Sequence, residues 1–284
     1  MFSRIVLVLT VAATVAGCGG AETDAEAKQV VAAFYPLAFA AEQIAGDAVE
    51  VTNLTPPGVE PHDLEISAGD VRTLREAELV LFLGGGFQPA VERAVAGRHS
   101  AVDLLETQPS TDAAAEMLVQ DPHVWLDPRA YARIVRRIGH ELDGEDGAEQ
   151  LALRVESLDA ELERGLGRCR RRDVVTSHAA FGHLARRYGL RQVALQGLAP
   201  EAEPTPRDLE RLVDDVRRAG ATTVFFEPLV APDLAETVAR ETGAATATLD
   251  PLEGLSEADV ARGADYFSVM RDNLAALRRA LDCT

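Results

Sequence analysis

The chain has six histidines among 284 residues, and one of them, His123, lies in the segment DPHVWLDP at residues 121–128. Each proline of this segment fixes its own backbone φ angle and pushes the preceding residue toward an extended conformation. His123 therefore lies on a short, stiff segment beside Trp125, the only tryptophan of the chain. Stiffness suits an imidazole that must point at a metal ion, but a single histidine in such a segment is more often structural. Other parts of the sequence must therefore show whether His123 is a metal ligand or a structural residue.

Further imidazoles and carboxylates lie where strand-like segments end, and open α/β sheets bind ligands beyond the carboxyl ends of their strands. The stiff loop TPPGVEPHDLE carries Glu60 and His62, and His178 directly follows the segment DVVTS. Glu227 and Asp250 end two more strand-like segments, TTVFFE and ATATLD. These groups are divided between the two halves of the chain. That distribution is what a metal site in a cleft between two lobes requires.

The elements that would position these groups alternate between strand-like apolar runs and helical patterns, which is typical of α/β architecture. The predicted strands are 29–35, 48–54, 78–84 and 100–105 in the first half, and 173–177, 191–196, 222–227 and 245–250 in the second. The predicted helices are 36–45, 67–77, 88–96, 128–142, 179–188, 206–219, 232–242 and 256–282. We therefore expect two similar α/β lobes.

The joint between the lobes lacks a flexible Gly/Pro hinge. Residues 148–168 instead carry one apolar stripe at helical spacing, formed by Leu151, Val155, Leu158, Leu162 and Leu166. We expect an N-terminal lobe at 29–145, a long connecting helix at 146–169 and a C-terminal lobe at 170–284, with the metal cleft between the lobes. Such a strut would hold the lobes in a nearly fixed orientation; the alternative is an ordinary surface helix of one lobe.

The N-terminal residues predict export. Residues 1–17 read as a signal peptide, because one arginine precedes a short apolar run and small residues. The sequence Val15-Ala16-Gly17-Cys18 resembles a bacterial lipobox, which implies cleavage before Cys18 and a lipid on that residue, with residues 18–28 as a tether. An ordinary signal peptide with an incidental cysteine is the alternative. The remaining cysteines, Cys169 and Cys283, would form a disulfide in an oxidising compartment.

Composition excludes one class of partner. The formal net charge is −18, whereas a nucleic-acid-binding surface must be basic. The glycines 84–86 have no Gly-Lys-Ser/Thr after them, so they form a strand-to-helix turn and no phosphate-binding loop.

Of the other histidines, His99 and His140 are expected in solvent. His183 is expected to be structural, because five residues place it about 140° around a helix from His178.

The motifs GVEPHDLE, DPHVWLDP, VVTSHAAFG, PEAEPTP, TVFFEPLV and LDPLEGL occur in an order that resembles the zinc/manganese substrate-binding lipoproteins of bacterial ABC importers. The similarity covers nearly the whole mature chain. It implies a monomeric receptor, anchored on the outer face of the membrane, that delivers a metal ion to a permease and its ATPase. In that family the metal ligands match His62, His123, His178 and Asp250.

The resemblance also assigns roles to three neighbouring acids. Glu60 matches a residue that approaches the metal in some zinc receptors, while Asp127 and Glu227 look like partners of the ligating histidines. Many zinc receptors carry a histidine-rich loop before DPHVWLDP, but residues 106–120 contain no histidine.

The expected ligand set favours one metal and one class of protein. Three imidazoles and one carboxylate suit Zn²⁺ better than Mn²⁺, which remains the alternative. We expect no enzymatic activity, since four protein ligands would close the site. Two further classes stay compatible with the sequence, an exported zinc hydrolase and a surface adhesin of the same fold.

Overall fold

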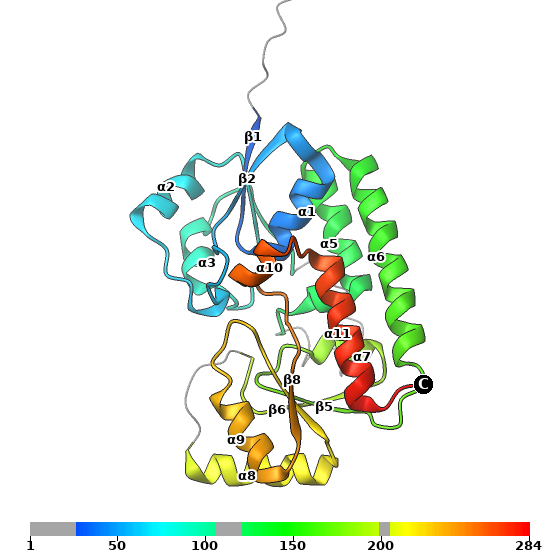
Figure 1. Ribbon diagram of the computed structural model, residues 1–284. Coiled ribbons are helices and arrows are strands. Elements are labelled where there is room, and N and C mark those ends of the chain that lie inside the picture. The colour runs from blue at the N-terminus through cyan, green and yellow to red at the C-terminus, as the bar shows by residue number, and fades with distance from the viewer. Residues whose placement is uncertain (1–26, 106–120, 199–204) are drawn as a thin grey trace, which may run out of the picture.

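The computed structural model describes residues 27–105, 121–198 and 205–284 and forms two lobes, one above the other in Figure 1. Each lobe is built on a four-stranded parallel sheet. The strands of the first sheet are β1 (Lys28–Ala32), β2 (Val49–Asn53), β3 (Leu79–Phe82) and β4 (Ala101–Asp103). Those of the second are β5 (Asp173–Thr176), β6 (Arg191–Ala194), β7 (Thr223–Phe226) and β8 (Ala245–Thr248).

The two sheets have the same strand order, β2-β1-β3-β4 and β6-β5-β7-β8. The order reverses between β1 and β3 in the first sheet, and between β5 and β7 in the second. Such a reversal is the place where an open parallel sheet binds its ligand. The predicted fold class, two similar α/β lobes, is confirmed, and every predicted strand corresponds to an observed one.

Proline fixes the start of several helices in the first lobe, because it suits the first helical turn, where its missing N–H is not needed. Pro36, Pro89 and Pro128 each occupy such a position. The helices are α1 (Tyr35–Ala45), α2 (Ala68–Glu76), α3 (Pro89–Val95) and α5 (Pro128–Glu141). Three short 3₁₀ segments lie at Gly46–Ala48, Pro61–Asp63 and Val124–Leu126.

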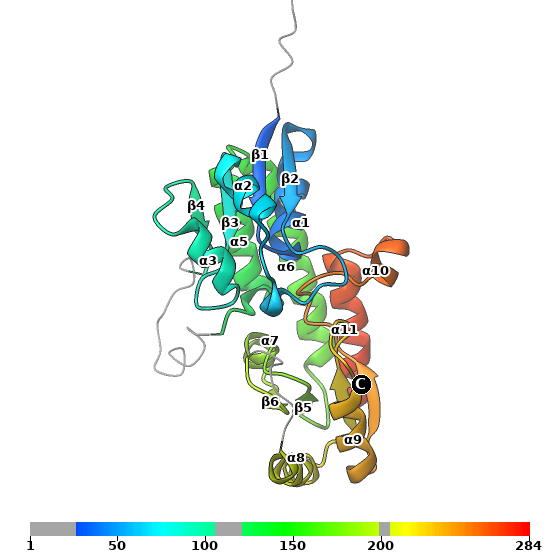
Figure 2. The same ribbon diagram turned by 90° about the vertical axis from the view of Figure 1, so that its left-hand side faces the viewer.

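The connecting helix α6 runs from Glu145 to Leu166, about 33 Å at 1.5 Å per residue. Its predicted apolar stripe is fully buried, from Leu151 to Leu166. Figures 1 and 2 show α6 running along both lobes next to α11 (Tyr266–Leu281), and it packs against α5, α1 and α11. One apolar core extends from the first lobe across these helices into the second lobe. The connection is therefore a packed strut.

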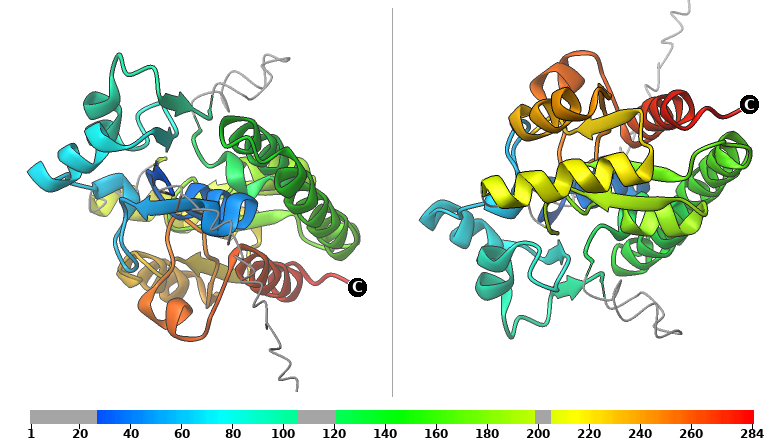
Figure 3. Two further views of the ribbon diagram at one scale, coloured as in Figure 1. Left: turned by 90° about the horizontal axis from the view of Figure 1, so that it is seen from above. Right: turned by 90° about the horizontal axis from the view of Figure 1, so that it is seen from below.

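The helices of the second lobe are α7 (Gly182–Arg187), α8 (Pro206–Ala219), α9 (Asp233–Thr242), α10 (Glu257–Ala261) and α11. In Figure 3, viewed from below, α8 lies across the second sheet. A smaller apolar cluster, including Val216 and Val224, lies between this sheet and the helices α8 and α9.

The prediction of one continuous helix over 256–282 is wrong. Gly263 adopts a left-handed φ of 66°, and Asp265 and Ser268 form a capping box that begins α11 afresh. The predicted helix at 179–188 is likewise shorter, because α7 begins at Gly182.

A disulfide joins Cys169, after α6, to Cys283, after α11. It closes the lower end of this helix pair. In the described part of the chain, no helix combines the length and hydropathy needed to cross a bilayer. The predicted signal peptide, Cys18 and the segment 106–120 lie outside the described residues.

Candidate metal centre

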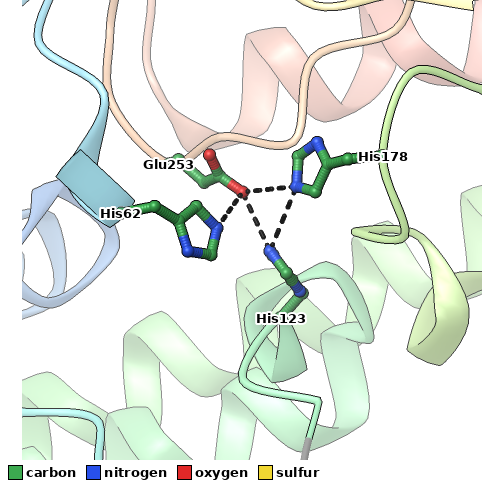
Figure 4. Close-up of side chains that lie close together, drawn as sticks. All are labelled: His62, His123, His178 and Glu253. Atoms are coloured by element: carbon green, nitrogen blue, oxygen red, sulfur yellow. Dashed lines mark hydrogen bonds and ion pairs between the residues drawn. The ribbon is translucent and has the colours of Figure 1, made fainter. Parts of the chain in front are cut away.

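Three imidazoles and one carboxylate converge between the lobes: His62, His123, His178 and Glu253 (Figure 4). Oε1 of Glu253 lies 2.9 Å from Nε2 of His123, 3.2 Å from Nε2 of His178 and 3.5 Å from Nε2 of His62. The Nε2 atoms of His123 and His178 are 3.4 Å apart. Four donor atoms from four separate segments therefore surround one point.

His62 comes from the loop after β2. Pro61 begins a single 3₁₀ turn, and the carboxylate of Glu60 accepts a hydrogen bond from the backbone N–H of His62 at 3.3 Å. The ring of Phe87, which follows β3, packs edge-on against the imidazole with centroids 4.7 Å apart. A stiff turn and an aromatic wall thus fix the direction of His62.

His123 is held by Asp121, two residues earlier. One carboxylate oxygen of Asp121 lies 3.0 Å from the backbone N of His123 and 2.7 Å from its Nδ1. Both side chains are buried. This contact leaves Nε2 directed at the cluster, which is how a carboxylate orients a ligating histidine.

His178 follows β5 and is held in the same way by Glu227, which follows β7. Glu227 accepts from the backbone N–H of His178 at 3.2 Å, and its other oxygen lies 2.6 Å from Nδ1. The carbonyl of His178 accepts hydrogen bonds from Thr176 and Gln192. The predicted role of Glu227 beside a histidine thus agrees with this geometry.

Glu253 takes the place in the cluster at which Asp250 was expected. The carboxylate of Asp250 accepts a hydrogen bond from the backbone N–H of Leu252 at 2.7 Å and lies outside the cluster. Leu252 has a left-handed φ of 55°, a conformation that costs a branched L-residue about 1–2 kcal/mol. The turn at Leu252 brings the following residue, Glu253, into the cleft, where it is buried. A turn of this kind gives no strong signal in the sequence LDPLEGL.

The structure also locates the other candidates. Asp127 caps α5 by accepting a hydrogen bond from the backbone N–H of Arg129. The carboxylate beside His123 was expected to be that of Asp127, but it is that of Asp121. His99 and His140 are exposed. His183 contacts the backbone carbonyl of Asp121 at 3.0 Å, which supports the segment that carries His123.

The charges of the cluster balance one another. Burial favours a neutral His178, but the carboxylates of Glu227 and Glu253 outweigh it and raise its pKa to about 10. Burial also opposes protonation of His123, yet Asp121 and Glu253 raise its pKa. Conversely, burial favours a neutral Glu253, but the imidazoles hold its pKa well below the usual value. Burial and the charge of Glu253 raise the pKa of Glu60 to about 9. His178 thus carries a proton at neutral pH that a metal ion would replace.

Apart from Nδ1 of His178, which pairs with Glu227, two buried atoms of the cluster have no hydrogen-bond partner among the described residues: Nε2 of His62 and Oε2 of Glu253. Unpaired buried polar atoms are costly unless something satisfies them, and a cation at the centre of the cluster would satisfy Nε2 of His62. His62 also lines an open hollow of about 480 Å³ with Asp63 and Glu65. The cluster is therefore reached from solvent on the side of His62.

The sequence as a whole matches one family of proteins. The family model described as ZnuA, zinc-uptake complex component A, periplasmic, matches residues 30–280. The high-affinity zinc uptake system protein ZnuA of Bacillus subtilis (strain 168) is 29% identical over 94% of this chain and 93% of its own length. The zinc-binding lipoprotein AdcA of Streptococcus pneumoniae (strain R6) is 33% identical over 89% of this chain, which spans only 56% of AdcA.

Solved structures show the same fold. The Zn(II)-bound ZnuA-like domain of S. pneumoniae AdcA aligns with a TM-score of 0.76 and 32% identity over 90% of this chain and 100% of that domain. The laminin-binding protein Lmb of Streptococcus agalactiae, described as bifunctional with adhesin and metal-transporting activity, aligns with a TM-score of 0.78 and 28% identity. That alignment covers 89% of this chain and 99% of Lmb.

Proposed function

Because this chain belongs to the family of the periplasmic zinc-uptake component ZnuA, we propose that it captures Zn²⁺ outside the cytoplasm and delivers it to an ABC-type importer. His62, His123, His178 and Glu253 are the proposed ligands. Glu60 stands beside them, and the ion is cargo that is bound and released unchanged.

The spacing of the four donor atoms carries this proposal. Tetrahedral Zn²⁺ at about 2.0–2.1 Å from its ligands requires donor atoms about 3.3 Å apart. Four of the six separations between these donors run from 2.9 to 3.5 Å, and all six lie within 4.8 Å. The donors are thus already near the required positions before an ion binds.

The donor types favour zinc over manganese. Imidazole nitrogen suits Zn²⁺, whereas Mn²⁺ prefers oxygen-rich sites of higher coordination. Replacing His178 by Glu would exchange one nitrogen for oxygen. We expect His178→Glu to weaken zinc binding and to narrow the gap between the two metals. Competition titrations would show this, with His99→Glu as the exposed control. A wild-type preference for manganese would contradict the zinc assignment.

Export and anchoring complete the proposal. The lipobox-like sequence at Cys18 supports a lipid anchor, and the relative AdcA is itself named a lipoprotein. The lipid would keep the receptor at the membrane that contains the permease. Radiolabelled palmitate should enter the wild-type chain and not Cys18→Ala.

Titration of Zn²⁺ into the metal-free protein tests the proposal directly. The ring of Trp125 lies 5.2 Å from that of His123, so its fluorescence should change and saturate near one equivalent. His123→Ala should remove the high-affinity phase, and His99→Ala should not. A response that needs many equivalents would contradict the assigned site. In the cell, deletion of the gene should impair growth under zinc chelation.

The hydrolase alternative conflicts with the ligand count. Catalytic zinc keeps one position open for water, whereas the four donors of this cluster fill a tetrahedron. The zinc-loaded protein should leave ester, amide and phosphate substrates intact.

Likeness to Lmb supports adhesion as a second proposal. Retention of the purified protein on immobilised laminin would test it, and a deletion strain that loses adhesion but grows normally under chelation would favour it over transport.

A further inference from the structure

One face of α11 contacts two of the segments that carry the proposed ligands. Tyr266 and Asn273 are seven residues apart, which places both on the same face of the helix. Both side chains are buried, with 0% and 2% of their surface exposed. Tyr266 reaches the segment of His123, and Asn273 reaches the loop of Glu253.

Asn273 holds the loop after β8 at Asp250. Its Oδ1 accepts from the backbone N–H of Asp250 at 2.8 Å, and its Nδ2 donates to the carbonyl of the same residue at 2.7 Å. Asp250 in turn accepts from Leu252, the residue with the left-handed turn before Glu253. A continuous chain of hydrogen bonds therefore runs from α11 to the backbone next to the carboxylate ligand.

Tyr266 holds the segment of His123. Its hydroxyl donates to the carbonyl of Trp125 at 2.7 Å, two residues beyond the histidine. The indole Nε1–H of Trp125 then donates to the carbonyl of Pro251, also at 2.7 Å. These bonds close a triangle between α11, the segment of His123 and the loop of Glu253.

We propose that Tyr266 and Asn273 are positioning residues that set the separation of His123 and Glu253 for the metal ion. The inference rests on the proposed function, because it takes Glu253 as a ligand. It also assigns a role to Asp250, which supports the loop of Glu253 without touching the ion. Partners that orient metal ligands commonly contribute about 10–100-fold to affinity.

A double-mutant cycle tests whether Asn273 acts through Glu253. Asn273→Ala should weaken zinc binding roughly tenfold, measured by competition with a chromophoric chelator, because the loop loses both hydrogen bonds. In a Glu253→Ala background the same change should cost less than about twofold, since the ligand that it positions is gone. Equal losses in both backgrounds would show a purely structural role and overturn the proposal.

Two buried tyrosines, Tyr266 and Tyr131, allow a second test that leaves the residues of the Glu253 loop unchanged. Tyr131 stacks on Tyr266 with centroids 4.4 Å apart and also donates at 2.7 Å to a backbone carbonyl, that of Pro36. Tyr266→Phe and Tyr131→Phe each remove one hydroxyl. Only Tyr266→Phe should speed the dissociation of zinc, by several-fold. Equal dissociation rates for the two variants would overturn the role of Tyr266.

The outcomes separate this inference from the function on which it rests. If wild type binds one zinc and Glu253→Ala weakens it, but neither Asn273→Ala nor Tyr266→Phe does, the proposed function stands and the positioning role fails. If Asn273→Ala does not fold, Tyr266→Phe still decides. If wild type binds no zinc, both proposals fall.

Discussion

Each buried histidine of the cluster uses its two nitrogens differently. In His123 and His178, Nδ1 faces a carboxylate, Asp121 or Glu227, while Nε2 faces the centre of the cluster. The carboxylates fix the ring orientation and make the free nitrogen a better donor. His62 instead receives support through its backbone N–H and from the ring of Phe87. We therefore expect the affinity for zinc to depend on Asp121 and Glu227, two acids that do not belong to the cluster.

We expect Asp121→Asn and Glu227→Gln each to lower zinc affinity by roughly 10–100-fold. Asp127→Asn is the control, because Asp127 caps α5 and does not belong to the cluster. Isothermal titration calorimetry would measure all three. A loss with Asp127→Asn as large as with Asp121→Asn would contradict the assignment.

Zinc affinity should fall in acid, because zinc binds only neutral imidazole. The pKa of His178 is raised to about 10, so this residue is protonated in the metal-free protein at pH 7 and must release a proton when zinc binds. The logarithm of the apparent affinity should then rise by at least about one unit per pH unit between about pH 7 and 9. Calorimetry in buffers of different ionisation enthalpy counts the protons. Zero released protons would contradict this description.

The residues of the cluster also show how much of the metal site could be predicted from the sequence. The three histidines could be predicted because each follows a strand or lies in a proline-stiffened loop. Asp250 was expected because it ends the segment ATATLD and matches a ligand position of the resembled family, but the left-handed Leu252 brings Glu253 into the cleft. Asp121 was missed in favour of Asp127, although both flank the same histidine motif. The local sequence does not show where a side chain points when its direction depends on a single backbone turn, as that of Glu253 does.

At the scale of elements, strands were easier to predict than helix breaks. Parallel strands form short runs bounded by turn residues, and all eight strands of the described residues could be located. The break before α11 was missed, although Gly263 and the capping box of Asp265 and Ser268 mark it. In α6 the pattern was sufficient, because its apolar stripe faces one continuous core.

The two faces of α6 should respond differently to the same substitution. Leu158 is fully buried, whereas Leu153 is 55% exposed. Leu158→Ala should lower the free energy of unfolding by about 2–5 kcal/mol, since it leaves a cavity. Leu153→Ala should change it by less than about 0.5 kcal/mol. Urea denaturation of the metal-free proteins would compare them, and equal losses would contradict the packing of α6.

At the scale of the whole molecule, the lobes are held together by more than the chain that links them. Asp159 on α6 binds Arg129 of the first lobe and Arg187 and Tyr188 of the second. The disulfide between Cys169 and Cys283 ties the ends of α6 and α11. A shared core with these links favours small adjustments around the ion over wide opening of the lobes.

Replacing both Cys169 and Cys283 by Ser should lower the free energy of unfolding by about 2–5 kcal/mol, because the bond closes a long loop in the unfolded chain. The cysteines are separated by 114 residues. Zinc stoichiometry should stay at one, since neither sulfur belongs to the cluster. Unfolding in urea unchanged from that of the oxidised wild type would contradict a stabilising role, and the wild type under reducing conditions should match the variant.

X-ray absorption at the zinc edge of the loaded protein tests the central claim most directly. The four-residue cluster predicts four nitrogen or oxygen donors at about 2.0–2.2 Å, with the multiple-scattering signature of three imidazoles. Glu253→Ala should replace the carboxylate oxygen by water and leave the imidazole signature, whereas Asp250→Ala should leave a carboxylate bound. A six-coordinate, oxygen-rich shell, or a spectrum without the multiple scattering of three imidazoles, would contradict the site.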